Sequence, residues 1–172
     1  MELLRSPEGC PWDRVQTHQS IRQNMLEEAY GAVDAIDHMD MDNLKEELGD
    51  VLLQVVFHAS MAQEAGQFTF GGVVDGICKK LVYRHPHVFG TADARDGSEA
   101  LAAWDAQKRA EKGQKTTADA LDSVARALPA LTRAAKLQGK AAKAGFDWKD
   151  VSPALDKLSE ELEELKTALE EG

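Results

Sequence analysis

Two stretches of the chain repeat apolar positions with the period of an α-helix. In the first, apolar side chains dominate a segment that includes Leu48, Val51, Leu52, Val55, Val56 and Ala59. In the second, leucines recur at helical spacing at Leu155, Leu158, Leu162, Leu165 and Leu169. Stripes of this kind are usually packing surfaces, so we expect both segments to be helices that pack through one face.

Residues that favour helix starts and ends divide the first half of the chain. Serine, threonine and aspartate cap helix N-termini, and glycine follows many C-termini. Residues 1–16 should form an irregular arm, followed by a helix that Thr17 or Ser20 caps and that runs to about residue 38. A second helix, capped by Asp40 or Asp42, should run to about residue 64 and stop at Gly66. A third should cover about residues 73–84. Proline disfavours helix at the preceding residue, so His85-Pro86-His87 should open a loop over residues 85–97.

The same signals predict three more helices in the second half. They are a helix from Ser98 through Lys112 closed by Gly113, a helix between Pro129 and Gly145 in the alanine-rich segment 118–144, and a last helix from Ser152-Pro153 onward. Proline suits the first position of a helix, and glycine suits the position after its end. The pattern therefore predicts an all-α fold.

Composition supports this fold and narrows the possible partners. The 172 residues are rich in Ala, Leu, Glu and Lys, which favour helices, and 43% are hydrophobic, enough for one folded domain or one domain with an appendage. The net charge of −10 argues against general nucleic-acid binding, which needs a basic surface. A small phosphorylated ligand stays compatible, because a metal ion and a few basic side chains can offset the acid locally.

Two cysteines, Cys10 and Cys78, form no CxxC pair and no disulfide framework. The sequence contains no signal peptide and no apolar run near 18 residues, the length that favours a membrane span. We therefore expect a cytoplasmic protein with no membrane contact.

Two clusters of carboxylates carry the most chemistry. Glu27-Glu28 lies in the first long helix, and Glu47 and Asp50 are three residues apart on the second, so these two share one helix face. Acidic side chains on helices usually form a solvated face. Here, however, Glu47 and Asp50 border the apolar stripe, where charges need partners. Carboxylates converging from two helices favour a hard cation such as Mg²⁺, and hence a site that could handle phosphate.

Five motifs occur in an order that resembles the MazG family of nucleoside triphosphate pyrophosphohydrolases. They are Gly9-Cys10-Pro11-Trp12-Asp13, Gln16-Thr17-His18, Leu26-Glu27-Glu28, Glu46-Glu47-Leu48-Gly49-Asp50 and Arg84-His85-Pro86-His87-Val88-Phe89-Gly90. The resemblance covers roughly residues 1–112. It implies a helical bundle formed by an intertwined homo-oligomer, a dimer most simply or a tetramer. It also implies Mg²⁺-dependent cleavage of (deoxy)nucleoside triphosphates to monophosphate and pyrophosphate, with a house-cleaning role in the nucleotide pool.

The resemblance also assigns residues. Glu27, Glu28, Glu47 and Asp50 match the acidic set that holds Mg²⁺, for which Mn²⁺ is a substitute, and takes part in catalysis. The family's third glutamate falls on Gly31, which offers no ligand. Either the metal is held less well, or Asp34 compensates through water, or the position was altered deliberately. We choose Glu27 as the base for the attacking water.

Two pairs of residues match the family's substrate-binding positions. Lys80 and Arg84, four residues apart on one helix face, are expected to bind phosphates, with a surface salt-bridged pair as the alternative. Trp104 and Lys108 match a second pair, in which the indole stacks on a base or is simply a core residue.

We expect three segments. Residues 1–115 form the MazG-like domain, residues 116–150 form an alanine-rich helical linker, and residues 151–172 form a C-terminal helix. In that helix Glu160-Glu161-x-x-Glu164 resembles the start of a second, incomplete copy. Gly31 keeps a second function open, that of a catalytically weak nucleotide-binding, regulatory or structural member of the same fold.

Overall fold

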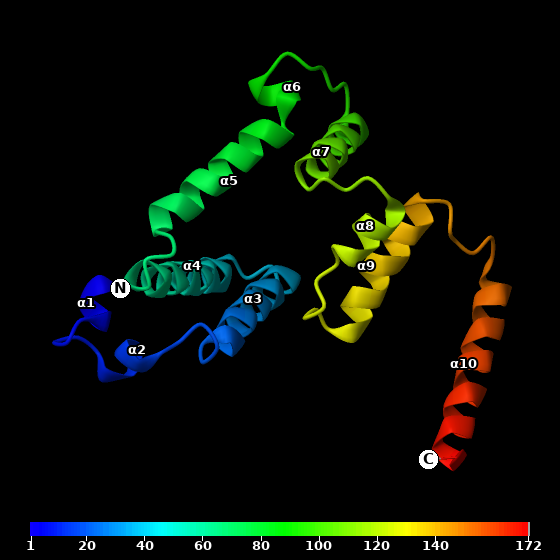
Figure 1. Cartoon of the computed structure of the whole chain (residues 1–172), viewed down its shortest axis with the longest axis horizontal. Coiled ribbons are helices and arrows are strands. Elements are labelled where there is room, and N and C mark those ends of the chain that lie inside the picture. The colour runs from blue at the N-terminus through cyan, green and yellow to red at the C-terminus, as the bar shows by residue number, and fades with distance from the viewer. Residues whose placement is uncertain (172) are drawn as a thin grey trace. The chain divides into compact units, whose positions relative to one another are not determined.

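The computed structural model describes residues 1–171, with side-chain burial through residue 170, and every regular element in that range is helical (Figure 1). The helices are α1 (Glu2–Arg5), α2 (Pro11–Val15), α3 (Arg22–Asp37), α4 (Met41–Glu64), α5 (Phe70–Arg84), α6 (Pro86–Phe89), α7 (Gly97–Glu111), α8 (Thr117–Asp122), α9 (Ala130–Lys143) and α10 (Val151–Glu171). The predicted all-α class is confirmed. Over residues 1–171, no helix combines the length and the apolar character that a membrane span requires.

The chain divides into two compact units. The first runs from Met1 to Ala92 and contains α1 to α6, and the second begins at Asp93 and contains α7 to α10. Within the first unit, α3 and α4 form the main packed pair, joined by the short connection 38–40. The core of this pair includes Ala32 and Ala35 on α3, and Phe57 and Met61 on α4.

Local capping explains where α4 begins and ends. The Asp40 carboxylate accepts a hydrogen bond from the Asn43 N–H (3.0 Å), which fixes the first turn. Gly66 adopts a positive φ of 67° just past the last turn, a conformation that favours glycine. Of the two predicted caps, Asp40 and Asp42, the structure uses Asp40, and the predicted stop at Gly66 is confirmed.

The predicted start of α3 was wrong by a few residues. Thr17 and Ser20 bond to each other, with the Thr17 N–H donating to Ser20 Oγ (2.8 Å) and the Ser20 N–H donating to Thr17 Oγ1 (3.2 Å). The two side chains therefore close a separate turn, and neither caps the helix. Helix α3 starts at Arg22, after the buried Ile21.

Other boundaries moved because a nearby side chain caps better. Thr69 caps α5, which begins three residues before the expected start. Asp96, rather than Ser98, caps α7 by accepting from the N–H groups of Ser98 and Glu99. Short helices replace expected irregular backbone: α1 and α2 in the arm, and α6 in the loop after residue 85. The alanine-rich segment adds α8, while α9 follows Pro129 and ends before Gly145, as predicted.

The N-terminal arm is tied to the end of α4. Arg5 pairs with both carboxylate oxygens of Glu64, at 2.6 Å from Nε and 2.7 Å from Nη2, and its guanidinium lies 5.5 Å from the centre of the Phe57 ring. Bidentate arginine–carboxylate pairs are geometrically specific. Met1 packs on the buried cluster of Ile21, Phe57 and Met61, so the arm covers this end of the α3–α4 core.

Two histidines join the turn before α3 to α4. His18 Nδ1 and His58 Nδ1 are 2.8 Å apart, and the rings are nearly parallel, at 3°. One ring must donate an N–H to the other, so the contact is lost if both are protonated. Burial lowers the pKa of His58, and the neighbouring His18 lowers that pKa further.

This pair should make stability depend on pH. Since the pKa of His58 is lowered in the folded chain, the unfolded chain binds its proton at a higher pH, and stability rises with pH in the window below the ordinary value of about 6.5. We expect His58→Gln to flatten the rise in melting temperature measured between about pH 5 and pH 7.

His38→Gln is the matched control. A hydrogen bond to the Asp34 carbonyl raises the pKa of the exposed His38, and the Asp34 charge adds to this. Its contribution is present at low pH and is lost as pH rises through the raised pKa, so His38→Gln should steepen the slope that His58→Gln flattens. An unchanged slope in His58→Gln would contradict this account.

Candidate functional site

The predicted acidic residues lie on the packed pair of helices in the first unit. Glu27 and Glu28 belong to α3, and Glu47 and Asp50 belong to α4. Burial raises the pKa of Glu28 above its ordinary value, and the charges of Asp50, Glu47 and Glu27, in that order, raise the pKa further. The fold therefore brings carboxylates of the two helices close enough to repel one another.

Gly31 is the position of α3 that the end of the Glu47 side chain of α4 reaches. A Cβ built on Gly31 would lie 2.2 Å from Oε2 and 2.6 Å from Cδ of Glu47, closer than real side-chain atoms approach. The Glu47 carboxylate thus lies directly over Gly31, about one turn from Glu28 on α3. The family resemblance describes position 31 as a missing metal ligand. In the fold, the space beside Gly31 is occupied by the carboxylate of Glu47, itself a candidate metal ligand.

The chemistry of these residues suits a hard cation. Carboxylate oxygens are the donors that Mg²⁺ takes, and a divalent charge would offset the repulsion around Glu28. Among residues 1–171, no three His, Cys, Asp or Glu side chains are already arranged as a metal-binding group. The charges of Asp50, Glu47 and Glu27 all act on Glu28, so the four carboxylates lie near one another without already forming such a group.

Asp34 does not join this group in the structure. It lies one turn beyond Gly31, where its carboxylate approaches the His38 ring at 3.5 Å and its carbonyl bonds the same ring at 2.9 Å. It is absent from the charges that shift the pKa of Glu28. Asp34 therefore acts at the end of α3 rather than as a substitute for the glutamate that Gly31 replaces.

Lys80 and Arg84 lie on α5, which follows α4 in the same unit. Lys80 is exposed, whereas Arg84 is only 7% exposed. Within the described residues Lys80 makes no salt bridge with the four carboxylates, and its neighbour Lys79 pairs with Asp75 at 2.6 Å. A contact of either residue with phosphate therefore remains a prediction.

Trp104 and Lys108 lie on α7, in the second unit. Lys108 Nζ lies 4.6 Å from the centre of the Trp104 ring, a cation–π contact expected for residues four apart on a helix. The lysine occupies one face of the indole, so a base could stack on that face only after the lysine moves. Nothing in the fold assigns either residue to a nucleotide.

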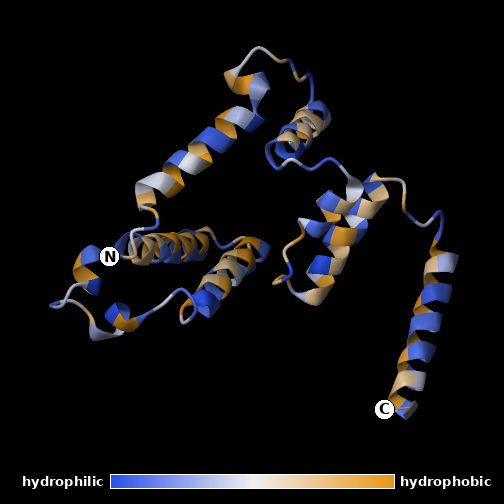
Figure 2. Cartoon of the chain, in the orientation of Figure 1, coloured by the Kyte–Doolittle hydropathy of each residue, from blue (hydrophilic) through white to orange (hydrophobic). Residues whose placement is uncertain are grey.

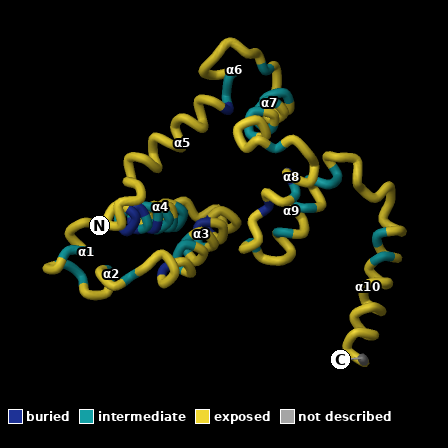
Figure 3. Tube along the Cα trace, viewed as in Figure 1, coloured by how far each residue is buried: buried dark blue, intermediate teal, exposed yellow. Residues whose placement is uncertain are grey.

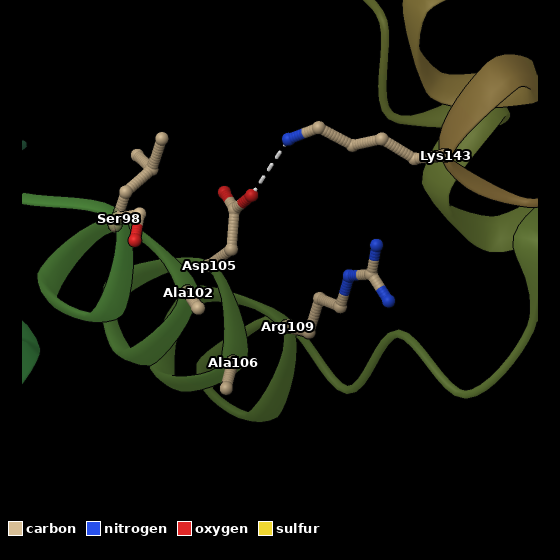
Figure 4. Close-up of a pocket in the computed structure, with 7 residues that line it drawn as sticks. Ser98, Ala102, Asp105, Ala106, Arg109 and Lys143 are labelled. Atoms are coloured by element: carbon tan, nitrogen blue, oxygen red, sulfur yellow. Dashed lines mark hydrogen bonds and ion pairs between the residues drawn. The ribbon is translucent and has the colours of Figure 1, made fainter.

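The sequence pattern missed several groups that the fold brings together. His18 was part of a quoted motif, but its partner His58 lies in the apolar stretch of α4, far away in sequence. Arg109 on α7 and Lys140 and Lys143 on α9 were also passed over, although Lys143 forms an ion pair with Asp105 at 2.8 Å (Figure 4). Their signal was a local excess of Lys and Arg in an otherwise acidic chain.

Comparison with known proteins gives a consistent result. The MazG nucleotide pyrophosphohydrolase domain matches residues 16–89. The nucleoside triphosphate pyrophosphohydrolase of Escherichia coli K12 is 49% identical over 166 residues, which cover 96% of this chain and 63% of that protein. The nucleoside triphosphate pyrophosphohydrolase/pyrophosphatase MazG of Thermotoga maritima is 47% identical over 98% of this chain and 64% of its own length.

A more distant relative, the nucleoside triphosphate pyrophosphohydrolase of Mycobacterium tuberculosis, is 43% identical over 85% of this chain and 44% of its own length. The chain thus spans a little under two thirds of the length of the Escherichia coli and Thermotoga proteins. The matched domain contains α3, α4 and α5 and all four carboxylates of the candidate site. The chain thus contains a MazG nucleotide pyrophosphohydrolase domain over residues 16–89, and it is similar over most of its length to these pyrophosphohydrolases.

Proposed function

We propose that this protein hydrolyses (deoxy)nucleoside triphosphates to nucleoside monophosphate and pyrophosphate in a Mg²⁺-dependent reaction. The observation that carries the proposal is the approach of α4 to α3, which sets the Glu47 carboxylate over Gly31 and beside Glu28. The names of the relatives support the reaction class. A triphosphate carries several negative charges, so a cation held between it and the carboxylates would allow both to share one space.

Glu28, Glu47 and Asp50 are the proposed ligands, with Glu27 at the edge of the set. When bound, Mg²⁺ (or Mn²⁺ in its place) would neutralise the triphosphate charge and favour departure of pyrophosphate. Glu27 is exposed and accepts a hydrogen bond from the Gln23 amide (3.4 Å), so it is the carboxylate least committed to the interior. We assign it the proton of the attacking water.

The basic residues are assigned to the substrate. Lys80 and Arg84 bind phosphate oxygens, the arginine as a fork and the lysine as a point charge. The family resemblance also assigns Trp104 and Lys108 to substrate binding. Cleavage between the first and second phosphates removes a nucleotide from the triphosphate pool, which fits a house-cleaning role.

A catalytically weak, nucleotide-binding member of the family is the second candidate, because Gly31 supplies no carboxylate. The place of Glu47 over this glycine weakens that argument, since the space is not left without an acid. Measuring turnover decides between the two.

The products identify the reaction. With dNTP or NTP and Mg²⁺ we expect monophosphate and pyrophosphate on ion-exchange chromatography, and no diphosphate. Asp50→Asn and Glu47→Gln should each lower turnover by about 10²-fold or more, because each removes a charge that balances the cation. Glu46→Gln, on the same helix and exposed, is the matched control and should retain activity. Diphosphate as first product, or full activity in both site variants, contradicts the proposal.

Position 31 tests the geometry. Gly31→Ala restores helix propensity worth about 1 kcal/mol, but its methyl group displaces the Glu47 carboxylate. We therefore expect a smaller Mg²⁺-induced rise in melting temperature than in the parent. Glu47→Asp combined with Gly31→Ala shortens the displaced side chain and should recover part of the rise, with Glu47→Asp alone as the control. If alanine leaves the Mg²⁺ response intact, Gly31 does not serve as clearance for Glu47.

We also propose that the chain forms a homodimer through its first unit. Large apolar side chains are exposed on all three long helices of this unit: Leu26, Tyr30 and Val33 on α3, Leu48 and Leu52 on α4, and Ile77 and Leu81 on α5. Apolar residues recur along α5, and most of this helix is exposed (Figures 2 and 3). Apolar surface on this scale usually marks an interface between proteins.

Light scattering tests the assembly. We expect twice the mass of one chain at tens of micromolar protein, or four times if dimers pair. Leu52→Glu places a charge on the exposed stripe of α4 and should shift the mass toward the single chain. A parent chain that is monomeric at this concentration would rule out the proposed dimer.

A further inference from the structure

The second unit contains a basic cavity that the proposed hydrolase reaction does not use. It has a volume of about 170 Å³ and is lined from α7, α8, α9 and the segment before α8. Four of its lining residues are cations: Arg109, Lys115, Lys140 and Lys143. No acidic residue lines it, although the chain has 30 acidic and 20 basic residues.

Most of this positive charge is not balanced by an ion pair. Within the described residues, Lys143 is the only one of the four cations in a salt bridge, with Asp105 at 2.8 Å. Lys140 Nζ lies 3.5 Å from the Ser123 hydroxyl, which is neutral. The hydrogen bond from Lys143 lowers the pKa of Asp105; burial raises that pKa, and the charges of Lys143, Lys108 and Arg109 lower it. The net effect is a lowered pKa, so Asp105 stays ionised and offsets one positive charge.

A second acid of this unit, Asp119, is committed to backbone donors. Asp119 accepts hydrogen bonds from the backbone N–H groups of Lys115 (2.9 Å) and Thr116 (2.8 Å), which hold the start of α8. Even when both acids are counted against the four cations, the local charge remains positive. Like charges gathered around a cavity repel one another, and an anion entering the cavity relieves that repulsion.

The polar lining suits a tetrahedral oxyanion. Gln114, Thr116 and Thr117 line the same cavity and carry amide and hydroxyl donors. Arginine and lysine together provide a fork and point charges, the usual combination for phosphate oxygens. These donors come from separate helices, so a bound anion would also tie those helices together.

An apolar surface adjoins the cavity. A wider hollow of about 550 Å³ shares Arg109 and Lys143 with it and is otherwise lined mainly along α7, by residues that include Leu101, Ala102 and Ala106. Figure 4 shows Lys143 and Asp105 facing each other at this hollow, with Arg109 beside them. The organic part of a phosphate ester could lie on the alanine and leucine side chains while its phosphate entered the basic cavity.

We infer that this cavity of the second unit is a binding site for a phosphate group. Free phosphate anions and phosphate esters share this chemistry. The inference does not rest on the hydrolase activity, because binding here needs no divalent cation.

Calorimetry of the whole chain in EDTA tests the inference with inorganic pyrophosphate as probe. Lys115→Gln with Lys140→Gln removes two cavity cations, and we expect the affinity to fall about tenfold or more, since each was a charge-assisted contact. Lys112→Gln with Lys136→Gln is the matched control: it removes the same charge from exposed positions that do not line the cavity, and it should bind within about twofold of the parent.

A second measurement does not depend on variants. In ¹⁵N-labelled parent chain, pyrophosphate should shift the amide signals of Gln114, Thr116 and Thr117 more than those of α3 and α4. The inference is overturned if millimolar pyrophosphate gives no saturable binding, if both double variants lose affinity equally, or if the shifts centre on the first unit.

Two further probes identify the source of the phosphate. Tighter binding of adenosine 5′-monophosphate than of inorganic phosphate, weakened by Leu101→Ser, assigns the site to a phosphate ester that uses the apolar surface. Equal or tighter binding of inorganic phosphate, insensitive to Leu101→Ser, assigns it to the free anion. Either result supports a phosphate site.

Discussion

The close packing of α3 on α4 is the contact on which the candidate site depends. Gly31, Ala32 and Ala35 present little side chain, so α4 can approach α3 closely enough for Glu47 to lie over Gly31. The same approach brings four negative charges together and raises the pKa of Glu28. Apolar burial along α3 and α4 has to offset this repulsion in the free protein, and a bound cation would remove it. Stability and metal binding are therefore coupled through one interface.

Local signals in the sequence located the helices well where the capping group was close at hand. Asp40 and Gly66 bound α4 because each acts on its own turn. The start of α3 was misplaced because Thr17 and Ser20 satisfy each other, and the start of α7 because Asp96 lies upstream of the expected Ser98. Such competition depends on backbone geometry that residue type alone does not specify.

The candidate site also has features that local sequence predicts and features that only the tertiary structure shows. The three-residue spacing of Glu47 and Asp50 predicts a shared helix face, a local property. Which residue of α3 faces Glu47 is a tertiary property, so the motif could describe Gly31 only as a lost ligand. The sequence pattern could not predict the His18–His58 contact or the basic cavity, because each joins side chains that are distant in sequence. The two units thus carry opposite local charge, an acidic space in the first and a basic cavity in the second.

Locating a bound Mn²⁺ tests the central claim most directly. In crystals of the whole chain grown with Mn²⁺, anomalous scattering should show an ion between α3 and α4. The account predicts carboxylate oxygens of Glu28, Glu47 and Asp50 within about 2.5 Å of that ion, the range of oxygen–metal bonds. An ion bound elsewhere, with these three carboxylates turned to solvent, would contradict it.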